Sequence, residues 1–130
     1  MNGSSVALDS SVAIDVLAGR ARPSLSSPAI TEFVLPVPVV GELRYGALNS
    51  RKAEKNLAEV ARFVARCRIL DVTVATADVY ARLRLELKTK GKPIPENDLW
   101  IAALCIEHDV KLAAVDVHFD AITQLQRFEL

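Results

Sequence analysis

The sequence predicts an α/β fold, in which one domain holds a central, mostly parallel sheet of about five strands between helix layers. Apolar runs of strand length alternate along the chain with longer stretches of helical periodicity. This alternation is typical of right-handed βαβ units, in which a helix carries the chain from one parallel strand to the next. With 130 residues, 51% of them hydrophobic, the chain is long enough to bury one sizeable core. Residues 1–130 are therefore expected to form a single domain.

The first quarter of the chain is expected to supply two strands and one helix. Residues 5–8 form a short apolar run, and residues 11–17 have helical spacing that stops at Gly19. Prolines and serines mark residues 20–29 as a loop. The apolar residues 33–35 then predict a second strand.

The middle of the chain is expected to hold three helices and one strand. Pro38 suits the first turn of a helix that carries apolar residues on one side. Residues 52–67 repeat apolar groups at helical spacing and place basic residues on another face. Residues 69–74 are rich in β-branched side chains and predict a strand, after which Thr76 can cap a helix over 77–90.

The last third is expected to contain the most buried helix and the last long strand. Asn97 or Asp98 can cap a helix over 99–107, which is apolar on nearly every side. Residues 110–115 predict a strand that ends at an aspartate, and residues 125–130 are a candidate edge strand.

Four acidic residues from separate parts of the chain are the candidate functional residues. Asp9 and Asp116 each follow a predicted strand, Asp98 begins the buried helix, and Glu42 lies beside apolar neighbours on another helix. Carboxyl ends of parallel strands meet at one edge of a sheet, and hard carboxylate ligands suit Mg²⁺ or Mn²⁺. Each acid also has a structural explanation as a helix cap, a turn residue or a solvent-facing residue. Position alone leaves both explanations open.

The motifs around these acids resemble the PIN-domain family, specifically the VapC-type toxins of prokaryotic toxin–antitoxin pairs. The resemblance covers nearly the whole chain. It rests on Leu8-Asp9-Ser10-Ser11 followed by Ile14-Asp15, Val40-Gly41-Glu42-Leu43 with Gly46, the stretch from Ile94 to Ala103, and Asp116-Val117-His118-Phe119. None of these motifs is specific alone, but four in this order make a chance resemblance improbable.

The resemblance implies a Mg²⁺-dependent endoribonuclease that is inhibited by a small antitoxin encoded alongside it and that forms a homodimer. The carboxylates would hold one or two ions, with Mn²⁺ as a substitute, that activate a water molecule and neutralise charge on the attacked phosphodiester. The resemblance assigns Asp9, Glu42 and Asp98 as the firmer metal ligands or water-holding residues, and Asp116 as the less firm one.

The chain departs from the family pattern just before its last acid. The family usually has Thr or Ser two residues before that acid and a polar residue directly before it, whereas Ala114 and Val115 stand here. Ser10 is a candidate to supply a hydroxyl near the metal, and Asp120 is either a turn residue or a substitute acid. The alternative function is therefore a catalytically degenerate PIN module that binds RNA or a protein partner.

The net charge of zero conceals two oppositely charged parts of the chain. Residues 44–92 hold 12 basic and 5 acidic residues, a balance of +7, and the remaining residues have a balance of −7. A basic surface beside an acidic centre suits contact with an RNA backbone, although solvated helix faces explain the same residues. The candidates are Lys55, Arg62, Arg66, Arg82, Arg84, Lys88, Lys90 and Lys92.

Two other classes of α/β protein lack their defining motifs here. A signalling receiver domain needs adjacent acids after the first strand, but Ser10 and Ser11 follow Asp9. A dinucleotide-binding domain needs a glycine-rich turn at that place, and there is none. Histidine-based nuclease chemistry is disfavoured, because His108 is interpreted as a helix-end residue and His118 as a turn residue.

The cysteines and the hydropathy predict a cytoplasmic protein that contacts no membrane. Cys67 and Cys105 are far apart, with no partner at metal-ligand spacing, and are expected to be small apolar residues. No apolar run reaches the roughly 20 residues that cross a bilayer. Met1 to Ser5 lack the basic flank and apolar stretch of a signal peptide.

Overall fold

The computed structural model describes residues 4–20 and 22–130. Residues 1–3, where no signal peptide is expected, and Ala21, inside the expected loop, lie outside the described residues. Within the described ranges, no helix combines the length and the apolar character that crossing a membrane requires.

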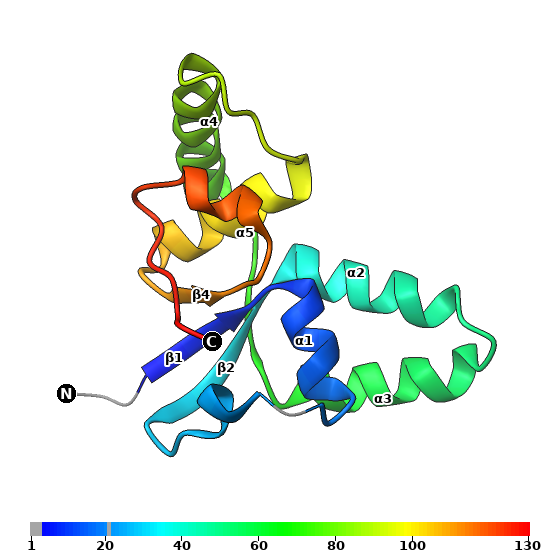
Figure 1. Cartoon of the computed structure of the whole chain (residues 1–130). Helices are drawn as coiled ribbons and strands as arrows, with labels where there is room; N and C mark the ends of the chain where they lie inside the picture. Colours follow the sequence, from blue (N-terminus) through cyan, green and yellow to red (C-terminus); the bar gives the residue numbers. More distant parts are fainter. Residues whose placement is uncertain (1–3, 21) are drawn as a thin grey trace.

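A parallel sheet with the strand order β3-β2-β1-β4 forms the centre of the fold (Figure 1). The strands are β1 (Ser4–Leu8), β2 (Ile30–Pro36), β3 (Arg68–Leu70) and β4 (Lys111–Ala113). Ala7 in β1 lies opposite Val34 in β2 on one side and opposite Leu112 in β4 on the other. The prediction of an α/β fold with a parallel sheet is confirmed.

The sheet has four strands among the described residues, rather than the expected five or so. The predicted edge strand over 125–130 does not form. In this segment a single isolated bridge joins Arg127 to Leu112. The Leu112 N–H donates to the Gln126 carbonyl, and the Phe128 N–H donates to the Leu112 carbonyl, both at 2.9 Å. With only three residues in β4, the terminal segment finds no further partners for a regular strand.

The helices form two arms that project from the sheet (Figure 1). Helices α2 and α3 pack against each other in one arm, and α4 and α5 pack against each other in the second. Helix α1 lies beside the first arm. The helical segments are α1 (Ser10–Leu17), the short 3₁₀ turn η1 (Pro23–Ser26), α2 (Val37–Leu48), α3 (Ala53–Ala65), α4 (Val74–Thr89), α5 (Glu96–Glu107) and the 3₁₀ turn η2 (Val117–Ala121).

Helix α5 is the most buried helix, as its apolar sequence predicts. It packs against α4, α2, β2 and β4, so that its sides face other elements in several directions. Its buried side chains are Leu99, Ile101, Ala102, Ala103, Leu104 and Cys105. The strands β1, β2 and β4 also contribute fully buried residues to this core.

The predicted cap of α4 was wrong by three residues. Thr73 is the cap and Thr76 is the third helical residue, because the backbone leaves the extended conformation before Val74. The hydroxyl oxygen of Thr76 accepts from the Thr73 N–H at 3.0 Å, and its proton goes to Glu107 Oε1 at 2.5 Å. The buried Thr76 thus joins α4 to the end of α5.

The predicted start of α5 was also wrong, since the helix begins at Glu96 after Pro95. Neither Asn97 nor Asp98 is the cap. Pro95 supplies a fixed backbone angle for entering the helix, and the chain continues directly into the first turn. Asp98 therefore lies inside this turn, so capping does not explain its presence.

Candidate active site

All four predicted acids lie around the carboxyl ends of β1 and β4. The strand order reverses at β1, because the chain first moves to β2 on one side and later adds β4 on the other. Such a switch point leaves a crevice beyond the strand ends in open α/β sheets. Asp9 directly follows β1, and its N–H donates to the Ala113 carbonyl at the end of β4 at 3.0 Å.

Asp9 is a buried carboxyl group, with 7% of the residue exposed. It occupies the cap position of α1, but its side chain makes no capping hydrogen bond there. Burial, together with the charges of Asp98, Glu42 and Asp116, raises the pKa of Asp9 from 3.8 to about 6, although a hydrogen bond from the Ser10 backbone lowers it. Asp9 therefore lies within electrostatic reach of the other three acids.

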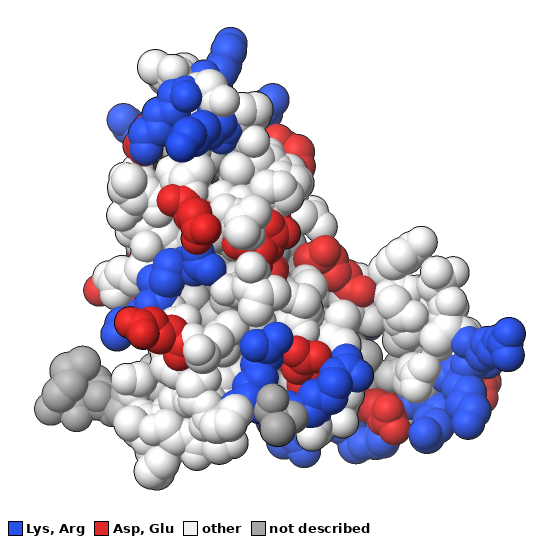
Figure 2. Space-filling view, in the orientation of Figure 1, with Lys and Arg blue, Asp and Glu red and all other residues white. Residues whose placement is uncertain are grey.

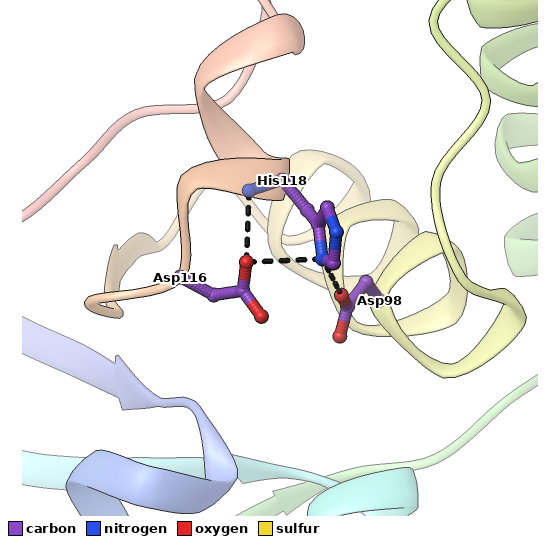
Figure 3. Close-up of side chains that lie close together, drawn as sticks. All are labelled: Asp98, Asp116 and His118. Atoms are coloured by element: carbon purple, nitrogen blue, oxygen red, sulfur yellow. Dashed lines mark hydrogen bonds and ion pairs between the residues drawn. The ribbon is translucent and has the colours of Figure 1, made fainter.

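The tightest group in the site consists of Asp98, Asp116 and His118, from α5, the loop after β4 and η2 (Figure 3). Their ligand atoms all lie within 4.8 Å of one another. His118 Nδ1 lies 3.2 Å from Asp98 Oδ2 and 3.0 Å from Asp116 Oδ1. The His118 backbone N–H also donates to Asp116 Oδ1 at 2.9 Å. This last contact fixes the orientation of the Asp116 carboxylate.

The pKa of Asp98 is raised by partial burial and by the charges of Asp116 and Glu42. The hydrogen bond and the charge of His118 act in the opposite direction. Both Asp9 and Asp98 thus carry a free-energy penalty for being ionised in the absence of a compensating cation.

Glu42 faces the site from α2 and is held by a side chain of α1. The Ser10 hydroxyl donates to Glu42 Oε1 in a short hydrogen bond. An open groove of about 660 Å³ runs past this pair, and Asn97 from the start of α5 lines it as well. The groove also has Ile14, Pro38, Gly41 and Tyr45 in its walls. Ser10 therefore positions Glu42 at the edge of an accessible groove.

The structure brings the four predicted acids together, and their spacing differs from the ranking that the family motifs imply. Asp116, the least firm acid in the sequence, belongs to the tightest group, whereas Asp9 and Glu42 lie outside that group. The two atypical residues before Asp116 do not account for its position in this group. Ala114 is buried in the core, and Val115 is 53% exposed. The backbone of His118 holds Asp116 instead.

His118 is the site residue that sequence reasoning missed. It does lie in a turn, as predicted, but its side chain also contacts two of the four acids. The available signal was its place two residues after Asp116. An aspartate that accepts from the backbone N–H two residues later brings that residue's side chain close to its own carboxylate.

Asp120 does not replace any acid of the site. It lies in η2 and forms an ion pair with Arg127 at 2.9 Å. The guanidinium of Arg127 also donates to the Ala114 carbonyl at 2.8 Å. The interpretation of Asp120 as a turn residue agrees with this position, and the pair connects η2 to the terminal segment.

Both cysteines are free thiols, and Cys105 lies near the site without facing solvent. Burial and, to a smaller extent, the charge of Asp9 raise the pKa of Cys105 to about 12. Burial also raises the pKa of Cys67 to about 11. Neither thiol is activated as a nucleophile.

Basic residues gather at the tips of the two arms, and acidic residues gather between them (Figure 2). The outer end of α4 carries the exposed Lys88, Lys90 and Lys92, and the turn between α2 and α3 carries the exposed Arg51 and Lys52. Some of the basic residues pair with an acid four positions away. Lys55 lies 3.7 Å from Glu59, and Lys90 lies 3.3 Å from Glu86.

A family model described as the PIN domain matches residues 6–125. The chain belongs to the PIN-domain family. This PIN domain is 35% identical to Ribonuclease VapC2 of Rickettsia felis over 79 residues, covering 61% of this chain and 59% of that relative. It is also 35% identical to Ribonuclease VapC2 of Haemophilus influenzae over 98 residues, covering 74% of each. The predicted resemblance to VapC-type PIN domains is confirmed.

A solved structure agrees with this PIN domain over nearly its whole length. The structure of VapBC-5 from Mycobacterium tuberculosis, a member of the VapBC family of toxin–antitoxin systems, superimposes with a TM-score of 0.78 at 27% identity. The match covers 98% of this chain and 99% of the solved chain.

The residues of this PIN domain fit a divalent cation. Asp98 and Asp116 present oxygen atoms that lie within 4.8 Å of each other, and two further acids lie within electrostatic reach. Partial burial and mutual repulsion disfavour the ionised form of Asp9 and Asp98. A divalent cation would remove both penalties, and its binding would require no new side chain.

Proposed function

We propose that this PIN domain is a metal-dependent endoribonuclease and the toxin of a VapBC-type toxin–antitoxin pair. The observation that carries the proposal is the convergence of Asp98 and Asp116 beside the buried Asp9, at the switch point of the sheet. The names of the ribonuclease relatives support the reaction class. The likeness to a VapBC complex supports a small antitoxin as the partner.

Asp98 and Asp116 would hold Mg²⁺, or Mn²⁺ in its place, because their oxygens converge most closely. A bound cation supplies an activated water molecule and neutralises charge on the attacked phosphate. Asp9, which is buried at the end of β1 beside these acids, would help to hold the cation and to orient that water. Glu42, fixed by Ser10, would orient groups that enter along the groove.

The basic arm tips would hold the RNA backbone on either side of the acidic centre (Figure 2). Contacts of this kind provide affinity that depends on salt and little on sequence. When no cation is bound, the acidic centre repels phosphate. RNA binding between the tips and metal binding in the centre should therefore strengthen each other. We also propose a homodimer of single-domain chains.

The test is cleavage of a structured RNA by the purified chain in the presence of Mg²⁺ or Mn²⁺. Asp98→Asn should lower the rate by at least about 100-fold, since it removes a proposed metal ligand. Asp78→Asn is the matched control, because Asp78 lies on the exposed face of α4 and pairs with Arg82. It should keep the rate of the unmodified chain.

The alternative of a non-catalytic PIN module gives a different result. A degenerate module would bind RNA or the antitoxin but would show no cleavage that depends on metal and on Asp98. Equal cleavage by the unmodified chain and Asp98→Asn would point to a contaminating nuclease and would contradict the proposal.

A further inference from the structure

One ring nitrogen of His118 faces two carboxylates at once (Figure 3). Nδ1 lies close to Asp98 Oδ2 and Asp116 Oδ1, while Nε2 is on the far side of the ring. The side chain of His118 is 46% exposed, so tight core packing does not impose this orientation. The contacts with the two aspartates define where the ring points.

The separations match those between neighbouring ligands of one metal ion. In octahedral coordination with bonds of about 2.1 Å, adjacent ligand atoms lie about 3.0 Å apart. His118 Nδ1 lies 3.0 Å from Asp116 Oδ1 and 3.2 Å from Asp98 Oδ2. Small movements of these side chains would therefore place one nitrogen and two oxygens around a common centre.

Hydrogen bonding alone accounts poorly for this arrangement. Nδ1 carries at most one proton, yet it faces two carboxylate oxygens. Asp116 Oδ1 already accepts the His118 backbone N–H at 2.9 Å. The group thus offers more acceptor atoms than donor protons, and a cation would satisfy all three ligand atoms together.

We propose that His118 Nδ1 is a direct ligand of the bound cation and makes the site prefer Mn²⁺ to Mg²⁺. This inference rests on the proposed metal-dependent function and adds a nitrogen to its ligand set. Mg²⁺ binds oxygen ligands and retains its water molecules, whereas an imidazole nitrogen is a good ligand for transition-metal ions. An all-carboxylate site would lack this source of selectivity.

Pulsed electron paramagnetic resonance of the Mn²⁺-loaded chain tests the ligand directly. A coordinated imidazole gives a nitrogen hyperfine coupling to the Mn²⁺ spin, and ¹⁵N-labelling of histidine changes that signal. The chain has two histidines. His118→Gln should abolish the coupling, and His108→Gln should retain it, because His108 follows α5 at its far end, beside Glu107.

Calorimetric titration with Mn²⁺ and with Mg²⁺ tests the selectivity. His118→Gln should weaken Mn²⁺ binding by about tenfold or more and Mg²⁺ binding by less than about threefold. The ratio of the two dissociation constants should be unchanged in His108→Gln. Circular dichroism establishes that both variants are folded, and the labelling experiment on the unmodified chain needs no variant.

The outcomes separate this inference from the proposed function. Mn²⁺ binding without a histidine nitrogen coupling in the unmodified chain overturns the role of His118 and leaves the metal-dependent nuclease intact. Equal weakening of Mn²⁺ and Mg²⁺ binding in His118→Gln overturns the selectivity. Failure of the unmodified chain to bind either ion overturns both proposals.

Discussion

The Ser10 hydroxyl at the start of α1 donates to Glu42 Oε1 on α2, across 32 positions of sequence. This hydrogen bond connects two of the four motifs on which the family resemblance rests. It lies in the wall of the groove beside the acidic centre. Ser10 is therefore a positioning residue for Glu42, rather than only the first residue of a helix.

Ser10→Ala should lower kcat for RNA cleavage by about tenfold and change KM little, because it frees Glu42 to adopt other rotamers without removing a contact to RNA. Steady-state kinetics on one defined RNA measure the two constants separately. Ser11→Ala, at the exposed neighbouring position, is the control. Ser10→Thr keeps the hydroxyl and should restore most of the rate. A rise in KM alone would assign Ser10 to substrate binding.

Asp9→Asn should stabilise the metal-free chain at pH 7 by up to about 3 kcal/mol. The pKa of Asp9 is raised from 3.8 to about 6, so the folded state loses stability as the pH rises from about 4 to 6, and the full penalty applies above about pH 6. Below about pH 4 the carboxyl is protonated in both states and the penalty is absent. Denaturant unfolding at pH 7 and pH 4 measures the difference. The gain should be present only at the higher pH, and an equal gain at both would assign it to packing.

Metal should stabilise the folded chain by relieving repulsion among the acids. At a free concentration of about 100 times Kd, the stabilisation is about 2.7 kcal/mol, which raises Tm by roughly 10 °C for a domain of this size. Thermal unfolding with Mn²⁺, Mg²⁺ or chelator measures the shift. Asp98→Asn should lose most of it, whereas Asp78→Asn should keep it. Absence of a shift at millimolar metal would favour the degenerate module.

Neutralising the outer end of α4 should weaken RNA binding in a salt-dependent way. The double variant Lys88→Gln, Lys92→Gln should reduce the slope of log K against log salt by about 1 to 1.5, if both residues contact phosphate. Fluorescence anisotropy in the Asp98→Asn background separates binding from cleavage. Lys111→Gln is the control, because Lys111 begins β4 and lies at the opposite end of that strand from the acids. An unchanged slope would indicate that the outer end of α4 is a solvated helix face that does not contact RNA.

The sequence predicted the fold class and the proximity of the four acids, because both depend on the order and spacing of the elements. Alternating apolar segments require a parallel sheet, and such a sheet brings Asp9 and Asp116 to the same edge whatever the helix boundaries are. The family motifs added Glu42 and Asp98. These predictions therefore tolerate errors of several residues in the individual elements.

The remaining errors arose where tertiary contacts decide between local choices. Thr73 and Thr76 are both reasonable caps, and only the contact of Thr76 with Glu107 identifies the inner one. Residues 125–130 have the composition of a strand, but a three-residue β4 gives them one bridge. The spacing of His118 from Asp116 indicates that the two residues are close, but it does not show which ring nitrogen faces the acids.

The terminal segment that failed to form a fifth strand still has a protective effect on the sheet. Its hydrogen bonds with Leu112 occupy polar groups on the open side of β4, and Arg127 contacts Ala114 after that strand and Asp120 in η2. An uncovered edge strand is a template on which strands of other molecules can add. The terminal segment, which contacts residues on both sides of Asp116, therefore also covers the edge of the sheet and disfavours edge-to-edge aggregation.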